Sequence, residues 1–250
     1  MIPVLLIVVP LLSGLATFFL KGESNAKRWA VLSSIITLVI SLLGLCVLKQ
    51  PGDLHADLPW LPQLGSSFNV GLDGMGQVLC LLTAIAFPVI FIATYNATYK
   101  NANRFYALML LSQAGLMGVF VAMDALVFYF FWELALIPVY FLSSIWGGEK
   151  RIAATFKFFI YTFAGSLLML IGIINIYYLA HESFSLKVWR ELHMLPVHQG
   201  WLFWLMFAAF AIKMPIWPFH TWQPDAYEQS PNAVTMVLSG IMAASPLSAQ

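Results

Sequence analysis

The sequence predicts an all-α, polytopic transmembrane helix bundle, and three observations lead to this prediction. Of 250 residues, 61% are hydrophobic and only 9% are charged, whereas an average soluble domain has about 25% charged residues. Apolar runs of about 20 residues, the length needed to cross a hydrocarbon core of about 30 Å, recur along the chain. One late run ends in two prolines three residues apart, Pro215 and Pro218, which predicts a broken helix.

Seven runs approach or meet the length of a membrane span, and a partial eighth begins near Val234. The runs are 2–20, 29–48, 75–95, 105–122, 125–146, 154–180 and 201–222. Because Met123 and Asp124 alone separate the fourth and fifth runs, we expect a tight helical hairpin in which Asp124 caps the fifth span. The longest connection, 49–74, contains the strand-like piece 67–70 and predicts a small extramembrane hairpin.

Basic residues are distributed unequally between the connections. The first, third and fifth connections hold seven Lys and Arg residues, whereas the second, fourth and sixth hold three. The positive-inside rule therefore predicts that the N-terminus lies outside and that the odd connections are cytoplasmic. A net charge of +1 without a basic tract argues against nucleic acid as a partner. Cys46 and Cys80 lie in apolar runs without metal-ligand spacing, so we expect core thiols.

Glu133 lies within the fifth apolar run, about 12 Å from its outer end at about 1.5 Å per residue. A carboxylate near the centre of a bilayer costs roughly 2.5 to 3.5 kcal/mol, so it is by default a candidate functional residue. Pro138, one turn later, frees a backbone carbonyl and favours a hydrated setting inside protein. The alternative is a protonated Glu133 hydrogen-bonded to a neighbouring helix.

Lys213 stands at the predicted break of the seventh span, just before the two prolines. Carbonyls freed by such a break survive in a membrane only against protein or a water-filled cavity. A desolvated lysine can release its proton and regain it when a carboxylate approaches, as a proton carrier must. Its alternative is a lysine that extends from a helix end toward the headgroups. His220, within the broken segment, is a candidate relay because histidine titrates near neutral pH.

Lys157 is a weaker candidate, because a lysine one turn into the sixth run can reach the cytoplasmic headgroups. Asp225 and Glu228 follow the break in a turn-rich stretch, 222–231, which we expect at a surface. No nucleophile array, haem-type histidine pair or acidic metal cluster appears in the spans. An acid and a base beside a broken helix favour ion or proton movement over covalent catalysis.

Three segments resemble one known family: 131–147 with Trp132-Glu133 and Pro138, 153–162 with Lys157, and 213–226 with the pattern Lys-Met-Pro-x-x-Pro-x-His. They resemble the chain M, or chain 4, family of antiporter-like membrane subunits in the proton-pumping NADH-quinone oxidoreductase, respiratory complex I. The likeness extends from Met1 to about Ala243.

The resemblance implies that Glu133 and Lys213 form a charge pair whose making and breaking gates proton passage, and that His220 lies on the path toward the middle of the membrane. It implies a fold of about fourteen helices with two inverted repeats. It also implies that NADH, FMN, iron–sulfur clusters and quinone are bound by other subunits, so that this chain holds no cofactor. The partners would be other membrane subunits of the complex, the lipid bilayer and protons, in a bacterial inner membrane.

The sequence departs from the family at two places. Tyr227 replaces the usual second histidine, and Ala244 stands where the family has a lysine. We hypothesise a truncated or frame-shifted chain with three parts: a three-helix region, 1–104, an incomplete first antiporter-like repeat, 105–243, and an aberrant tail, 244–250. Such a chain should not pump by itself.

Other functions stay open at this point. A subunit of a multisubunit sodium/proton antiporter or of a membrane-bound hydrogenase shares the glutamate and the broken-helix lysine. A polytopic structural or assembly protein, and a membrane enzyme that acts on lipid or quinone, are alternatives from other classes.

Overall fold

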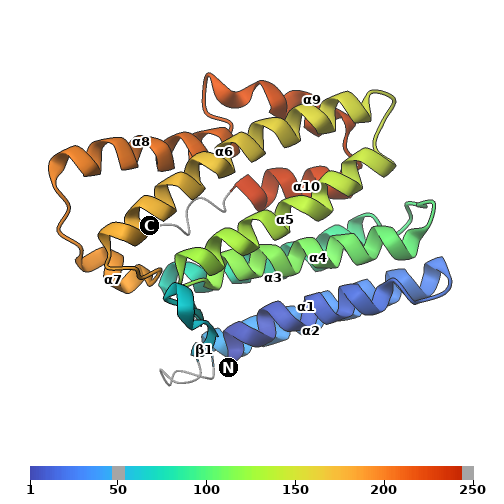
Figure 1. Ribbon diagram of the computed structural model, residues 1–250. Helices are drawn as coiled ribbons and strands as arrows, with labels where there is room; N and C mark the ends of the chain where they lie inside the picture. The colour runs from blue at the N-terminus through green and yellow to red at the C-terminus, as the bar shows by residue number, and fades with distance from the viewer. Residues whose placement is uncertain (47–53, 244–250) are drawn as a thin grey trace.

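The computed structural model describes residues 1–46 and 54–243 and has the form of a bundle of roughly aligned helices (Figure 1). The end of the predicted 29–48 span, the start of the 49–74 connection and the predicted tail 244–250 lie outside the described residues. In Figure 1 the N-terminus, β1 and α7 lie at one end of the bundle. The turns after α1, α3 and α5 lie at the other end, so successive connections alternate between two faces, as a polytopic membrane protein requires.

The helices follow the predicted runs closely through the first 180 residues. In chain order they are α1 (Ile2–Thr17), α2 (Glu23–Cys46), α3 (Gly74–Ala93), α4 (Ala102–Val121), α5 (Ala125–Trp146), α6 (Arg151–Leu179), α7 (Leu186–Glu191), α8 (Pro196–Lys213), α9 (Trp222–Gln229) and α10 (Asn232–Gly240). Five of them, α2 to α6, are long and apolar enough to cross a membrane. The apolar α1 is shorter, with 16 residues, and α8 has 18. The chain is thus an integral, multi-pass membrane protein.

The predicted hairpin is present among the described residues. Strand β1 (His55–Leu61) pairs antiparallel with β2 (Ser66–Gly71), and the short 3₁₀ helix η1 (Pro62–Leu64) joins them. Gly65, which follows η1, has a φ of 63°, a left-handed conformation that glycine adopts without a Cβ penalty. The otherwise all-α fold therefore includes a two-stranded ribbon at one end.

Asp124 links this ribbon to the start of α5. Its Oδ1 accepts hydrogen bonds from the backbone N–H groups of Leu126 and Val127, which are unpaired donors of the first turn. The same oxygen accepts a hydrogen bond from the hydroxyl of Ser66 in β2. The predicted cap is confirmed, and the structure adds the contact with the hairpin.

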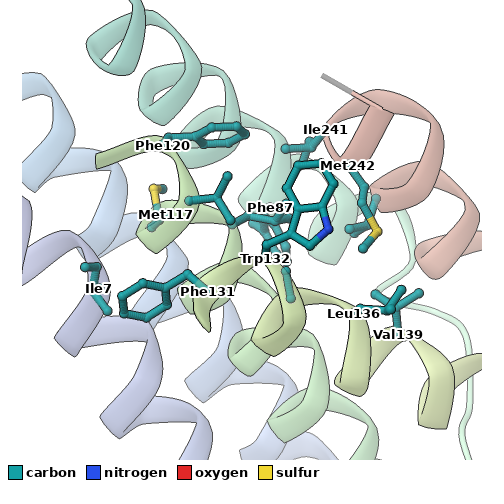
Figure 2. Close-up of a cluster of buried hydrophobic side chains, with 14 of the residues drawn as sticks. Ile7, Phe87, Met117, Phe120, Phe131, Trp132, Leu136, Val139, Ile241 and Met242 are labelled. Atoms are coloured by element: carbon teal, nitrogen blue, oxygen red, sulfur yellow. The ribbon is translucent and has the colours of Figure 1, made fainter. Parts of the chain in front are cut away.

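The α4–α5 hairpin packs so closely that it requires glycine on α4. A Cβ at Gly115 would lie 2.7 Å from the backbone of Ala135, and one at Gly118 would collide with the ring of Phe131. Phe131 can therefore lie flat against α4 and points toward Ile7 of α1, whereas the next residue, Trp132, points toward α10 (Figure 2). Consecutive side chains of α5 thus serve two different parts of the core.

We predict that Gly115→Ala destabilises the protein by about 1–3 kcal/mol, the usual cost of overpacking, because the Ala135 backbone cannot move aside alone. Gly200→Ala in α8 is the matched control, because no atom lies within 4 Å of the added Cβ. Thermal unfolding in detergent would measure both. Equal melting temperatures for the two variants would contradict the proposed close approach.

Asp124 offers a second test. Burial raises the pKa of its carboxyl above the ordinary value, while hydrogen bonds from Val127, Ser66 and Leu126 oppose that rise. A carboxyl with a raised folded-state pKa binds its proton more tightly when folded, so its contribution to stability is present below about pH 4 and declines as the pH rises through the folded-state pKa.

We therefore expect that the stability of Asp124→Asn does not decline in this way as the pH rises. The asparagine retains an acceptor oxygen but cannot titrate. Asp124→Ala should cost about 0.5–2 kcal/mol at every pH, because the donors of the first turn lose their acceptor. Melting temperatures between pH 4 and pH 8 would distinguish the two variants. Parallel pH curves for the wild type and Asp124→Asn would show that the carboxyl keeps its ordinary pKa.

Candidate functional site

Helix α8 ends inside the bundle, and the chain continues along the same direction as α9. In Figure 1, α8 runs from the α7 end to about the middle of the bundle, and α9 lies toward the opposite end. Between Lys213 and Trp222 the chain passes two prolines and the short 3₁₀ helix η2 (Phe219–Thr221). The Trp217–Pro218 peptide bond is cis. The stretch that separates the two helices contains all of the residues of the Pro-x-x-Pro-x-His pattern.

The stretch 222–231 is not a turn, because α9 occupies Trp222–Gln229, but Asp225 and Glu228 are exposed, as expected. Pro224 is compatible with this helix because it lies in the first turn, where a missing N–H costs no intrahelical hydrogen bond. Asp225 also lies in the first turn, where a negative charge favours a helix.

The carbonyls at the end of α8 are satisfied by protein groups beyond the helix. Three accept hydrogen bonds: Phe210 from the Met214 N–H at 2.8 Å, Ala211 from the Ile216 N–H at 2.8 Å, and Ile212 from the Trp222 indole at 2.9 Å. The third contact joins the two helices across the break. An irregular backbone can lie at this depth because neighbouring groups replace the hydrogen bonds that a continuous helix would have made.

Lys213, the last residue of α8, is buried with 6% of its surface exposed. Its Nζ lies 3.3 Å from the centroid of the Trp132 ring on α5. Thus, the side chain does not extend to the surface, which excludes the alternative of a lysine that reaches the headgroups from a helix end. It also borders a small cavity whose other lining residues are Phe158, Thr162, Trp222, Leu238, Met242 and Ala243.

Glu133 lies on α5 next to Trp132 but faces another direction. It is half-buried and lines a mostly apolar groove between α5 and the hairpin, together with Trp60 and Tyr129. Its Oε1 is buried and has no hydrogen-bond partner among the described residues. Glu133 forms no ion pair within 4.0 Å in the described ranges, although it is close enough for its charge to act on Lys213. The residue in contact with the ammonium is Trp132.

His220 lies in η2, between the two helices of the break. It is half-buried, and its Nδ1 is buried without a hydrogen-bond partner in the part of the chain that the structure describes. An imidazole with an unused nitrogen can accept or pass a proton. This geometry is compatible with the predicted relay.

Lys157 has a partner that the sequence did not indicate. Its Nζ lies 2.8 Å from Oδ2 of Asp225, so α6 and α9 are joined by an ion pair. Both side chains are partly exposed in a polar cleft near the α5–α6 turn, which also includes Glu149, Lys150 and Glu228. One helical turn further along α6, the hydroxyl of Tyr161 lies 2.9 Å from that of Thr221. The polar contacts therefore follow α6 from the cleft toward the break.

The far end of α9 is fastened to the α5–α6 turn. The Gln229 carbonyl accepts a hydrogen bond from Gly148 at 2.8 Å, and its side-chain oxygen accepts one from the Lys150 N–H at 2.9 Å. Beside them, the hydroxyls of Ser143 and Ser230 lie 2.9 Å apart. The end of α5 and the α5–α6 turn thus hold the far end of α9 in place.

Among residues 1–46 and 54–243, no group of three His, Cys, Asp or Glu side chains is placed to hold a metal ion. The fold and the site together define the class: a multi-pass membrane protein with a buried lysine at the end of a helix.

Comparison with known proteins gives the family. The family model described as NADH:quinone oxidoreductase/Mrp antiporter, transmembrane, matches residues 122–247. The chain belongs to this family. The matched residues include the α5 glutamate, the ion pair between α6 and α9, and the whole break.

Individual relatives agree with this assignment. The chain is 38% identical over 246 residues to F(420)H(2) dehydrogenase subunit M of Methanosarcina mazei, covering 93% of this chain and 50% of that protein. It is 33% identical over 260 residues to NADH-quinone oxidoreductase subunit M of Escherichia coli, covering 95% of this chain and 51% of that protein. A chain in the structure of respiratory complex I from Thermus thermophilus with bound NADH superposes with a TM-score of 0.86 at 27% identity, covering 98% of this chain and 51% of that chain. The chain therefore spans about half the length of the relatives it matches.

We predict a small coupling energy for the Lys157–Asp225 pair, about 0.2–1 kcal/mol, because both side chains are partly exposed. A double-mutant cycle with Lys157→Ala, Asp225→Ala and both together, read by thermal unfolding in detergent, would measure it. A coupling above about 3 kcal/mol would instead indicate a pair removed from water. The cycle Lys187→Ala with Glu182→Ala, two exposed residues outside this cleft, is the control.

Proposed function

We propose that this chain is a membrane subunit of a proton-translocating NADH-quinone oxidoreductase. It moves protons across the membrane, and electron transfer takes place in other subunits, which bind NADH, FMN, iron–sulfur clusters and quinone. The observation that carries the proposal is the buried Lys213 at the end of α8, with Glu133 near it on α5. An ammonium and a carboxylate within one bundle form an acid and a base that can exchange a proton through water or a relay.

In this proposal α8 and α9 are the two halves of a broken seventh span, α1 is the first span and α10 begins the eighth. The basic odd connections face the cytoplasm of a bacterial cell, and the N-terminus and hairpin face the outside. The polar cleft at Lys157 then opens to the cytoplasm. The partners are the other membrane subunits of the complex and the surrounding lipid.

The proposed path uses the polar contacts between α6 and the break. Protons enter at the cleft of Lys157 and Asp225, and pass near Tyr161 and Thr221. Lys213 is the central carrier, Glu133 adjusts its affinity for a proton, and His220 relays the proton onward. Of these residues, Lys157 is the weakest candidate for direct proton transfer, because its ion pair with Asp225 already explains its position.

A subunit of a sodium/proton antiporter is the second candidate, because the matched family is described by both the oxidoreductase and the Mrp antiporter. A membrane-bound hydrogenase subunit belongs to the same alternative. Vesicles loaded with sodium would separate the candidates. Proton uptake driven by a sodium gradient without NADH supports the antiporter, and proton uptake that depends on NADH supports the oxidoreductase.

We expect Glu133→Gln and Lys213→Met, made in the assembled complex, each to lower proton translocation about tenfold or more, equivalent to about 1.4 kcal/mol on the barrier of the limiting step. Each change removes a charge and largely keeps the side-chain volume. Proton uptake by inverted membrane vesicles supplied with NADH would measure it, normalised to NADH oxidation with an artificial electron acceptor.

The matched controls are Glu182→Gln and Lys187→Met, which remove the same charges from exposed positions outside the site. These variants should translocate protons at the wild-type ratio. If Glu133→Gln and Lys213→Met behave like the controls, the proposed function fails for this site.

A further inference from the structure

The ammonium of Lys213 lies against the face of an aromatic ring. Its Nζ is 3.3 Å from the ring centroid of Trp132, well inside the distance of about 6 Å at which a cation is attracted to an aromatic ring. Tryptophan gives the strongest such attraction among the aromatic residues, and removal from water strengthens it. Both partners are buried, with 6% of Lys213 and 2% of Trp132 exposed.

Other rings hold the indole in position. The ring of Phe128, one turn earlier on α5, lies 5.5 Å from that of Trp132, and the ring of Phe210 on α8 lies 5.9 Å away. Figure 2 shows Trp132 within the cluster of buried side chains beside α10. The ring face is thus a preformed surface, and Lys213 does not have to order it by binding.

No other charged side chain faces Lys213 at close range in the described part of the chain. The residues around its small cavity come from α6, α9 and α10 and its continuation, and none of them titrates: Phe158, Thr162, Trp222, Leu238, Met242 and Ala243. Glu133 on α5 is the carboxylate whose charge acts on the ammonium. Among the side chains, the ring of Trp132 and the carboxylate of Glu133, two consecutive residues of α5, therefore stabilise the charged lysine.

Trp132 and Glu133 project from different sides of α5, because successive residues of a helix are about 100° apart. Lys213 has a flexible four-carbon stem. Such a stem lets the ammonium change position by rotation of side-chain torsions. In the present structure it lies on the ring.

We propose that Trp132 is a positioning residue that holds the protonated Lys213 whenever the lysine is not paired with Glu133. This inference rests on the proposed function and adds a third member to the site. An ammonium released from a carboxylate in a low-dielectric interior is strongly destabilised and would lose its proton at once. The indole face keeps the charge on Lys213 until the next proton acceptor is in reach, so the order of transfer steps is maintained.

Fluorinated tryptophans at position 132 test the proposal directly. Successive fluorine atoms on the indole weaken the attraction of the ring for a cation and change its shape very little. We expect the NADH-driven proton uptake of the assembled complex to fall stepwise with each added fluorine. A flat series would overturn the proposal, because a merely structural role for Trp132 would not depend on the charge distribution of its ring.

Ordinary substitutions give a second measurement. Trp132→Phe keeps a weaker ring, whereas Trp132→Leu removes the ring. In Trp132→Leu we expect the alkaline limb of the uptake–pH profile to move to lower pH by about one unit, because the protonated lysine loses its cation–π contact. Trp132→Phe should lie between Trp132→Leu and the wild type.

Phe131→Leu is the matched control. Phe131 is equally buried on α5, with 5% exposed, but points to the opposite side, toward α1 (Figure 2). It should cost stability without moving the pH profile. A profile that moves equally in Phe131→Leu and Trp132→Leu would overturn the proposal.

The outcomes also separate this inference from the function on which it rests. If Lys213→Met abolishes proton uptake and the fluorinated series is flat, the site functions without Trp132 and only the inference fails. If Lys213→Met has no effect, the proposed function itself fails.

Discussion

The burial of one positive charge is the constraint on which the rest of the site depends. Lys213 is 6% exposed, and a desolvated ammonium is costly unless a neighbouring group favours its charge. The sequence places it at the last position of α8, where the negative end of the helix dipole and the nearby carbonyls favour a cation. The indole face of Trp132 and the charge of Glu133 add to that stabilisation. Lys213 thus lies at a helix end and against a ring, and a carboxylate follows that ring by one residue on α5.

The place of Lys213 depends on where α8 ends. Two prolines prevent α8 from continuing, and the Trp222 indole returns across the break to the Ile212 carbonyl. One side chain of α9 thus satisfies the Ile212 carbonyl of α8, and a second residue of α9, Asp225, connects α9 to α6. The interruption costs backbone hydrogen bonds but allows a charged residue to end a helix within the bundle rather than at its surface.

Hydropathy and turn chemistry were sufficient to predict most of the fold. The runs that became α2 to α6, the Asp124 cap and the extramembrane hairpin depend on local sequence: apolar length, an Asp before a helix, and a strand-like piece among prolines and glycines. The contacts of the site could not be predicted from the sequence. Lys157 and Asp225 are 68 residues apart, and the residues of α9 were expected to form turns rather than a helix, so nothing local indicated their ion pair. Trp132 is next to Glu133 in the sequence. The sequence alone does not give the rotation of α5 about its axis, and this rotation decides which of the two side chains faces Lys213.

The fastening of α9 at Gln229 has a mechanical consequence. Hydrogen bonds to Gly148 and Lys150 hold α9 at this end. The helix can therefore tilt about the α5–α6 turn, and the tilt moves its other end, which carries Trp222. Eight residues span about 12 Å, so a tilt of about 10° displaces that end by about 2 Å. Such a displacement exceeds the tolerance of the Trp222–Ile212 hydrogen bond. A small movement of the α5–α6 turn would therefore break or restore the Trp222–Ile212 hydrogen bond. Its acceptor residue, Ile212, directly precedes the buried lysine.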